Sequence, residues 1–391
     1  MKQNPKVLIL SGIQIEPTNS GGQLRTQNLA KEFEKYSEEV VIFSFTGRRA
    51  DYVAKVSGGW QTIGPKIREY VDRSQLNGFL QWVCYKLHLP PFWLTWSDTK
   101  NCPSLLKELI SDADVLVSDF PFFFRFLESN SPQKLCVLNT HNIEAELYKS
   151  RLVQRYVEGV ESRAYQAAKA SFFCSEAERE HFGAADDASA FVIPNGIDEK
   201  LYAPVSASER TRLRRELNIP DDKSVFLFTA ARHVPNLDAF GKLQAWAKEN
   251  QALLKKLNAL ILVAGSVSES FVLEDYFRAE GRVESMFPYF HIADFALNPV
   301  ETGSGTNVKM LEFMAAKLPI LSTSFGTRGT NLTPEESYLP ITFETLGEKI
   351  EQSLKIVDRE RMSELAYQQN QNLVSMKFAF SKFAEAYLVR N

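Results

Sequence analysis

The sequence contains few cysteines, and their arrangement excludes several classes of protein. Only four occur in 391 residues (Cys84, Cys102, Cys136 and Cys174), with no C-x-x-C pair and no histidine cluster nearby. A disulfide framework and a structural zinc site are therefore not expected. The pattern is typical of a reduced cytoplasmic protein without a bound metal.

Long apolar runs and an excess of one charge are also missing. No stretch approaches the roughly 20 apolar residues that span a bilayer. The net charge of −3 gives no reason to expect nucleic acid as a partner. The short apolar run near the N-terminus lacks a small-residue cleavage site, so it predicts a buried strand rather than a signal peptide.

Short, branched apolar runs alternate with helical patterns along both halves of the chain. Strands are predicted at Lys6–Leu10, Val40–Phe45, Asp114–Ser118, Lys134–Asn139, Val225–Thr229 and Ala259–Ala264. This alternation indicates an α/β protein with two facing, doubly wound domains. The polar segment 206–215 suggests domains at 1–205 and 206–374, and an amphipathic helix at 375–391 is expected to close the N-terminal domain.

Residues 51–101 have an irregular, aromatic-rich pattern that predicts no regular element. Together with Phe120–Phe126 (FPFFFRF), this region has two interpretations. It forms either a hydrophobic lobe that meets a bulky acceptor or the periphery of a membrane, or ordinary core and interhelical packing. Core packing is the favoured interpretation.

The segment 298–329 combines a glycine loop, a helix and a strand. The loop Gly303-Ser304-Gly305 precedes a helix that is predicted to open near Thr306, and helix N-termini favour anions. Lys309 and Glu312 share one face of this helix. A cation and a carboxylate beside such a loop suit a ligand with phosphate and sugar hydroxyl groups.

Two further segments carry polar residues at the ends of predicted strands. Ser20-Gly21-Gly22 follows the first strand without forming a G-x-G-x-x-G fingerprint, so a nicotinamide or flavin cofactor is not indicated. His141 lies just beyond the strand at 134–139, where open α/β sheets bind ligands. A structural hydrogen bond is the alternative role for His141.

Four segments resemble the family-four retaining glycosyltransferases of the GT-B fold over nearly the whole chain. They are Ser20–Gly22, THNIE at 140–144, VIPNGID at 192–198 and GSGTNVKMLEFMAAKLPILST at 303–323, and TAARHVPNLDA at 229–239 is similar to the start of the donor domain in one branch. The resemblance implies that Glu312 bonds the ribose of a nucleotide-sugar and Arg232 neutralises its diphosphate. It also implies that His141 lies near the transferred sugar and Gly22 near the phosphates or acceptor. The loop residues implied to line the donor are Gly303, Ser304, Gly305, Thr306 and Asn307.

The sequence departs from the family pattern at two positions. Many members have a glutamate eight residues before the one matched by Glu312, where this chain has Ser304; Glu301 is the nearest acid. Many members also have a lysine five residues after the arginine, where this chain has Leu237. Lys309 is the candidate to supply that second phosphate charge.

The predicted reaction moves a hexosyl group from a UDP- or GDP-sugar to the hydroxyl of a glycan, lipid-linked or protein acceptor, with retention. Arg232, Lys309 and His141 are the expected catalytic residues, and no cofactor beyond the nucleotide-sugar is expected. Two alternatives stay open: a nucleotide-sugar epimerase of similar fold, and a non-catalytic subunit that binds a partner transferase or an acceptor protein.

Overall fold

The structure is a computed structural model, and it describes residues 4–16, 21–45, 59–72, 83–84, 86–91, 103–196, 199–273, 275–303, 307–356, 358–369 and 372–389. The chain divides into two compact units. Unit 1 contains residues 1–196 and 373–391, and unit 2 contains residues 197–372. The expected boundary at 205/206 lies nine residues further along the chain, because α8 (Glu199–Tyr202) packs on helices of unit 2.

Unit 1 is built on one sheet with the strand order β3-β4-β2-β1-β5-β6-β7-β8. All neighbouring strands are parallel except the edge pair β3 and β4. The strands are β1 (Lys6–Ser11), β2 (Glu39–Phe45), β3 (Gly59–Thr62), β4 (Ile67–Asp72), β5 (Val115–Asp119), β6 (Leu135–Asn139), β7 (Ala170–Phe173) and β8 (Ala190–Val192). The central strands are buried on both faces, which explains their continuous apolar sequences.

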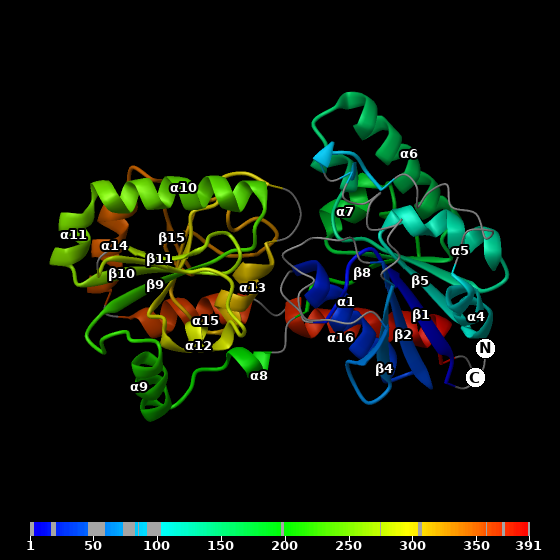
Figure 1. Ribbon diagram of the computed structural model, residues 1–391, viewed down its shortest axis with the longest axis horizontal. Helices are drawn as coiled ribbons and strands as arrows, with labels where there is room; N and C mark the ends of the chain where they lie inside the picture. Colours follow the sequence, from blue (N-terminus) through cyan, green and yellow to red (C-terminus); the bar gives the residue numbers. More distant parts are fainter. Residues whose placement is uncertain are drawn as a thin grey trace. The chain divides into compact units, whose positions relative to one another are not determined.

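Helices cover both faces of this sheet (Figure 1). One face packs against α1 (Gly21–Glu34) and α16 (Asn372–Tyr387), and the other against α4 (Ser104–Asp112), α5 (Phe124–Asn130) and α6 (Arg151–Ala167). The remaining short elements are η2 (Pro121–Phe123), η3 (Glu144–Leu147) and α7 (Glu176–His181). The unit is therefore a three-layer α/β/α sandwich.

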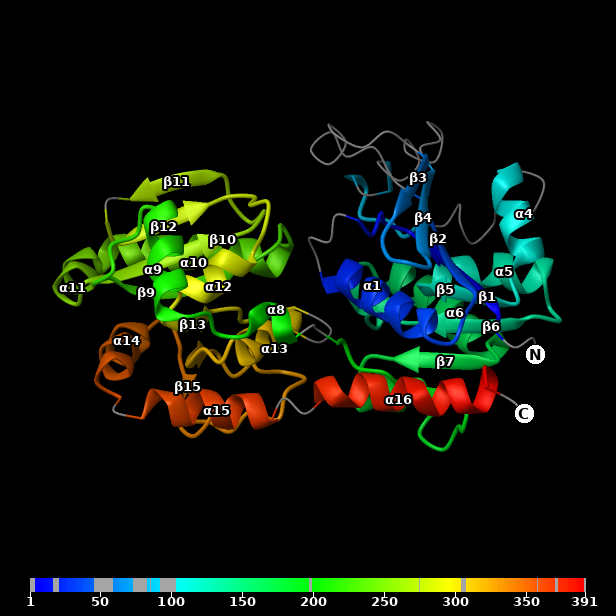
Figure 2. The same ribbon diagram turned by 90° about the horizontal axis from the view of Figure 1, so that it is seen from below.

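The C-terminal helix α16 is part of the core of unit 1, as expected from the sequence. The ring of Phe383 lies 4.7 Å from that of Phe172 in β7, and the ring of Phe380 lies 4.8 Å from that of Phe33 in α1. Figure 2 shows the helix running alongside β7. Residues more than 200 positions apart therefore share one apolar layer.

Unit 2 has a second sheet, with the order β11-β12-β10-β9-β13-β14-β15. Its strands are β9 (Ser224–Thr229), β10 (Ala259–Ala264), β11 (Ser270–Leu273), β12 (Phe277–Glu280), β13 (Phe295–Asn298), β14 (Ile320–Ser322) and β15 (Leu339–Pro340). Its helices are α8, α9 (Ala207–Glu216), α10 (Val234–Glu249), α11 (Gln251–Lys256), α12 (Phe287–Ile292), α13 (Val308–Ala315), α14 (Leu346–Lys355) and α15 (Arg359–Gln369). Apart from the antiparallel β11–β12 pair, the paired strands are parallel.

The parallel strands of each unit end at one edge of their sheet. In unit 1, residues 119 and 139 are paired neighbours at the ends of β5 and β6. In unit 2, residues 298 and 322 are paired neighbours at the ends of β13 and β14. Within each sheet, the loops that follow these neighbouring strands start side by side. Such edges are where open α/β sheets bind ligands.

Candidate functional site

His141 is held by an aspartate at the carboxyl end of the neighbouring strand. Its Nε2 lies 2.7 Å from Oδ1 of Asp119, and the side-chain amide of Asn139 donates to the same oxygen at 2.7 Å. The hydroxyl groups of Ser11 and Thr26 donate to the other oxygen at 2.9 and 2.8 Å. Asp119 therefore accepts four hydrogen bonds while being completely buried.

These contacts keep Asp119 ionised. Burial alone would raise the pKa of the carboxyl group, but the charge of His141 and the hydrogen bonds from His141, Asn139 and Thr26 outweigh it. The pKa of Asp119 is consequently lower than its usual value. Because an ionised carboxylate only accepts, Nε2 of His141 carries the proton that is donated to it.

The other ring nitrogen of His141 faces Gly22. A Cβ atom at position 22 would lie 3.4 Å from Nδ1. One face of the imidazole ring stacks on the ring of Phe120, with centroids 4.2 Å apart and an angle of 10° between the planes. Phe120 itself has a φ of 103°, a conformation that is costly for a residue with a side chain. His141 and Gly22 are thus brought together, with Gly22 in the first turn of α1.

Arg25 in α1 connects His141's loop to the end of β8. Its Nε donates to the carbonyl oxygen of Thr140 at 2.9 Å, and its Nη1 donates to that of Ile193 at 2.7 Å. The side chain is only 2% exposed. Neither Arg25 nor Asp119 was predicted as a site residue. Asp119 directly follows a predicted strand, which is the signal that identified His141.

In unit 2, Lys309 and Glu312 lie on α13 as predicted, each with a polar partner from another element. The Nζ atom of Lys309 donates to Oδ1 of Asn236 at 3.0 Å and lies 4.8 Å from the centroid of the Phe228 ring. The hydroxyl group of Tyr202 donates to Oε1 of Glu312 at 2.8 Å. Tyr202 was not predicted, because it is distant from Glu312 in the sequence.

Both groups titrate near neutral pH. Burial lowers the pKa of Lys309 to about 7, with a further decrease from the charge of Arg328, and Glu312 opposes the change. Burial raises the pKa of Glu312 to about 7, although the Tyr202 hydrogen bond and the Lys309 charge act in the opposite direction. Perturbed pKa values of this kind are characteristic of functional sites.

The remaining predicted residues lie in different settings. The side chain of Arg232 is exposed, and its backbone N–H donates to Oγ of Ser266 at 3.0 Å. Glu301 is also exposed, and its Oε2 pairs with Nζ of Lys242 in α10 at 2.7 Å. Buried Asn307 donates from Nδ2 to the carbonyl oxygen of Gly326 at 2.9 Å. Ser304, Gly305 and Thr306 lie outside the described residues.

Gly303 has a φ of 140°, a conformation that favours glycine. A Cβ atom at position 303 would lie 3.2 Å from Nη2 of Arg328 and 3.4 Å from Cγ of Pro235. Gly303 thus lies beside the N-terminal turn of α10, as does Lys309 through Asn236.

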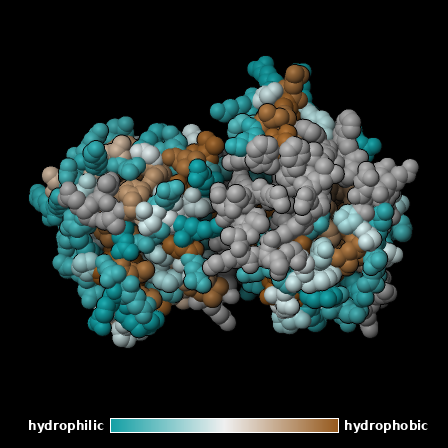
Figure 3. All heavy atoms as spheres, viewed as in Figure 1, coloured by the Kyte–Doolittle hydropathy of each residue, from teal (hydrophilic) through white to brown (hydrophobic). Residues whose placement is uncertain are grey.

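The aromatic lobe proposed from the sequence lies largely outside the described residues. Its second part, 120–126, belongs to the core: Phe122, Phe123, Phe124 and Phe126 are all buried. For these residues the core interpretation is confirmed, because they pack between the sheet and α6. Apolar surface is visible near α6 in Figure 3. Leu152, which belongs to this helix, is 79% exposed.

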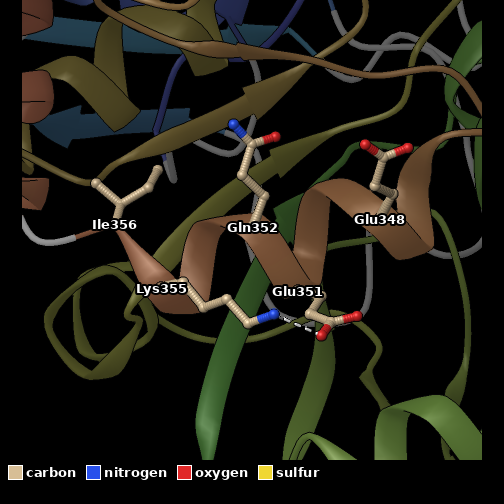
Figure 4. Close-up of a pocket in the computed structure, with 5 residues that line it drawn as sticks. All are labelled: Glu348, Glu351, Gln352, Lys355 and Ile356. Carbon is tan, nitrogen blue, oxygen red and sulfur yellow. Dashed lines mark hydrogen bonds and ion pairs between the residues drawn. The ribbon is translucent and has the colours of Figure 1, made fainter.

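Other candidate sites in the described part of the chain are few. It contains no group of three or more His, Cys, Asp or Glu residues that could hold a metal ion. None of its helices combines the length and apolar composition needed to cross a membrane. A hollow beside α14 is lined by five residues of segment 348–356, with an ion pair between Lys355 and Glu351 (Figure 4). The whole lining comes from α14 and the residue that follows it. The hollow therefore has no polar groups that converge from different elements.

Comparison with known proteins finds one family that resembles part of the second unit. Residues 225–352 match the family model described as Glycosyl transferases group 1. Comparison with curated protein sequences gives no significant match. This part of the second unit is therefore similar to the group 1 glycosyl transferases.

Similar solved structures extend the likeness to the fold of the whole chain. The sucrose-phosphate synthase of Thermosynechococcus elongatus matches with a TM-score of 0.68 and 14% identity, covering 98% of each chain. HepE of Anabaena, in complex with UDP and glucose, gives 0.66 and 13%, covering 98% of this chain and 100% of that one. OtsA in its apo form gives 0.65 and 11%, covering 99% and 100%.

These findings confirm the GT-B fold and the resemblance to GT-B glycosyltransferases. The match over residues 225–352 supports glycosyl transfer by the second unit, and the solved structures, at 11–14% identity, support the fold.

Proposed function

We propose that the protein transfers a hexosyl group from a UDP-sugar to an acceptor hydroxyl with retention at the anomeric carbon. The observation that carries this proposal is the Lys309–Glu312 face of α13, oriented by Asn236 and Tyr202 at the carboxyl edge of a parallel sheet. UDP is the favoured nucleotide because HepE was solved with UDP and glucose. Glycans, lipid-linked sugars and proteins are the proposed acceptor classes, and the cytoplasm, with peripheral membrane contact, is the proposed location.

In the proposed reaction, the bond between the anomeric carbon and the β-phosphate oxygen breaks. A bond to the acceptor oxygen forms on the same face of the sugar, and the acceptor proton passes to the leaving diphosphate. Lys309 and Arg232 stabilise the negative charge that develops on the diphosphate. Glu312 accepts hydrogen bonds from the ribose hydroxyl groups through Oε2, or through Oε1 in place of Tyr202.

His141 is proposed to act at the sugar. Its Nε2 is occupied by Asp119, so Nδ1, which faces Gly22, is the nitrogen that can contact a ligand. The fixed orientation prepares the ring before substrate binds, which lowers the cost of reaching the transition state. His141→Ala is expected to abolish most transfer while UDP binding is largely kept. Unchanged transfer would assign His141 a structural role.

The experiment that tests the function has two stages. Thermal stabilisation by UDP, GDP, ADP and their glucose conjugates identifies the donor base, since a ligand of the native state raises its melting temperature. Mass spectrometry with candidate acceptors then identifies the product. Failure of every nucleotide to stabilise the protein would favour the non-catalytic subunit.

Lys309→Met should reduce turnover about 100-fold, because one electrostatic contact to a transition-state charge contributes about 3 kcal/mol. Lys317→Met is the matched control. Lys317 follows the same helix and lies 4.4 Å from the ring of Tyr367, but its ion pair is with Glu364. Wild-type turnover in the Lys309 variant would refute its assigned role.

A further inference from the structure

The loop after β14 brings a second cation to the edge of the sheet where Lys309 lies. β14 is the parallel neighbour of β13, with Ser322 paired to Asn298, so the loops that follow the two strands are adjacent. Arg328 lies in the loop after β14, and Gly303 in the loop after β13. The Nη2 atom of Arg328 lies 3.2 Å from the position of a Cβ on Gly303.

This loop is fixed by hydrogen bonds to the neighbouring strand and helix. The carbonyl oxygen of Gly326 accepts from the side-chain amides of Asn298 at 3.1 Å and Asn307 at 2.9 Å. Its N–H donates to Oγ1 of Thr323 at 2.9 Å. A Cβ atom at position 326 would lie 2.4 Å from Oγ of Ser322, so only glycine fits there. The base of the loop is therefore preorganised.

The guanidinium group of Arg328 is oriented by the loop itself. Its Cζ lies 4.2 Å from the centroid of the Phe325 ring, and its Nη1 donates to the carbonyl oxygen of Phe325 at 3.2 Å. Stacking on a ring leaves the edge of the guanidinium plane as the direction for further contacts. The Nη2 atom is on the side of the guanidinium group that lies next to Gly303.

Arg328 and Lys309 belong to one electrostatic cluster. The charge of Arg328 contributes to the low pKa of Lys309, after burial. Both groups lie beside the first turn of α10: Pro235 packs on Gly303, and Asn236 accepts the hydrogen bond from Lys309. The charge of Glu312 opposes the decrease in the pKa of Lys309, and the hydrogen bond that Nζ of Lys309 donates goes to the neutral side chain of Asn236. A dianionic group bound between the two cations would remove their mutual repulsion.

The resemblance to glycosyltransferases implies a cation at one position of α10 where this chain has none. Leu237 stands where many similar glycosyltransferases have a lysine, and its side chain is 38% exposed. We propose that Arg328, together with Lys309, binds the diphosphate of the donor and supplies the charge that Leu237 lacks. A guanidinium group suits this role because its planar fork can donate two hydrogen bonds to phosphate oxygens. This assignment rests on the proposed function.

The test compares UDP with uridine on the full-length protein. Arg328→Gln keeps a planar polar group but removes the charge, so UDP affinity by calorimetry should fall about 10- to 100-fold, the usual range for one charge-assisted contact. Uridine affinity, measured by ligand-observed NMR, should be unchanged. Arg328→Lys should give an intermediate loss, because it keeps the charge without the fork.

Arg359→Gln is the matched control. Arg359 also stacks on an aromatic ring, 4.9 Å from that of Phe295, and donates to a carbonyl oxygen, that of Leu354. It should bind UDP like the wild type. Undiminished UDP binding by both Arg328 variants, or equal losses of UDP and uridine, would overturn the assignment alone. Wild-type protein that binds neither UDP nor GDP would overturn the proposed function and the assignment together.

Discussion

Replacing Asp119 by asparagine tests whether the buried carboxylate is ionised. Four donors converge on Asp119, two on each oxygen. In Asp119→Asn, the amide oxygen can take the place of Oδ1 and keep the bonds from Asn139 and His141. The hydroxyl groups of Ser11 and Thr26 can then rotate to accept from the new NH₂ group. The geometry should therefore survive while the charge is lost.

The magnitude follows from this loss of charge. Hydrogen bonds to a charged group contribute about 1.5–3 kcal/mol each, and neutral ones about 1 kcal/mol. If two of the four bonds weaken in this way, the free energy of unfolding of unit 1 should fall by about 1–4 kcal/mol. Asp119→Ala should cost more, because it leaves buried donors without an acceptor.

The pH dependence has a definite sign. Because the pKa of Asp119 is lowered in the native state, its stabilisation is fully present above the unfolded-state pKa and is lost as pH falls through the native-state pKa. The part of the difference between wild type and Asp119→Asn that comes from ionisation of Asp119 should thus be fully present above about pH 5, about one unit above the unfolded-state pKa. It should shrink only below about pH 4.

The assay is hydrogen exchange of the amides in β5 and β6, with those of β10 in unit 2 as an internal reference. Asp187→Asn is the control variant. Asp187 is a surface aspartate of the same unit that accepts hydrogen bonds from Tyr165 and Ser189. It should leave exchange in β5 and β6 unchanged. Unchanged exchange in Asp119→Asn would refute the reasoning, because it would mean that Asp119 is already protonated in the native protein.

Three further predictions concern other parts of the molecule. Tyr202→Phe removes a hydrogen bond that lowers the pKa of Glu312, so the pH profile of UDP affinity should shift to higher pH; an unshifted profile would contradict this. Gly265→Ala should destabilise unit 2 by at least about 2 kcal/mol in urea unfolding, because φ is 121° and the new Cβ would lie 2.2 Å from the carbonyl oxygen of Ala230. Phe383→Ala should destabilise unit 1 by about 3–5 kcal/mol in the same assay, and a loss below 1 kcal/mol would show that α16 contributes little to the core.

Much of the fold could be predicted from the sequence, because strands buried on both faces have continuous apolar runs. The segment 259–264 was predicted with its observed bounds, and 6–10, 40–45 and 225–229 within one residue. In contrast, β4 falls in a region predicted to be irregular. In its sequence, IREYVD, buried residues alternate with exposed or half-buried ones, but one buried position is occupied by Glu69, so the apolar alternation is interrupted.

The site was predictable only where local sequence carried the signal. Lys309 and Glu312 are three residues apart on one helix, so their shared face follows from helical geometry. Tyr202 meets Glu312, and Arg25 meets Ile193, over more than 100 residues of chain. No local pattern encodes such contacts, because they depend on the tertiary packing within each unit. Asp119 is the intermediate case, since the strand-end rule that identified His141 applies to it equally.

The contribution of α16 to unit 1 has a consequence for synthesis on the ribosome. Unit 2 is one continuous segment, residues 197–372, so it can complete its core while translation is still under way. Unit 1 lacks Phe380 and Phe383 until that later segment has emerged, and until then Phe33 and Phe172 have no aromatic partners from α16. Most of unit 1 is synthesised first, yet it is the last unit to complete its core. Its apolar layer therefore stays accessible to chaperones until α16 has emerged.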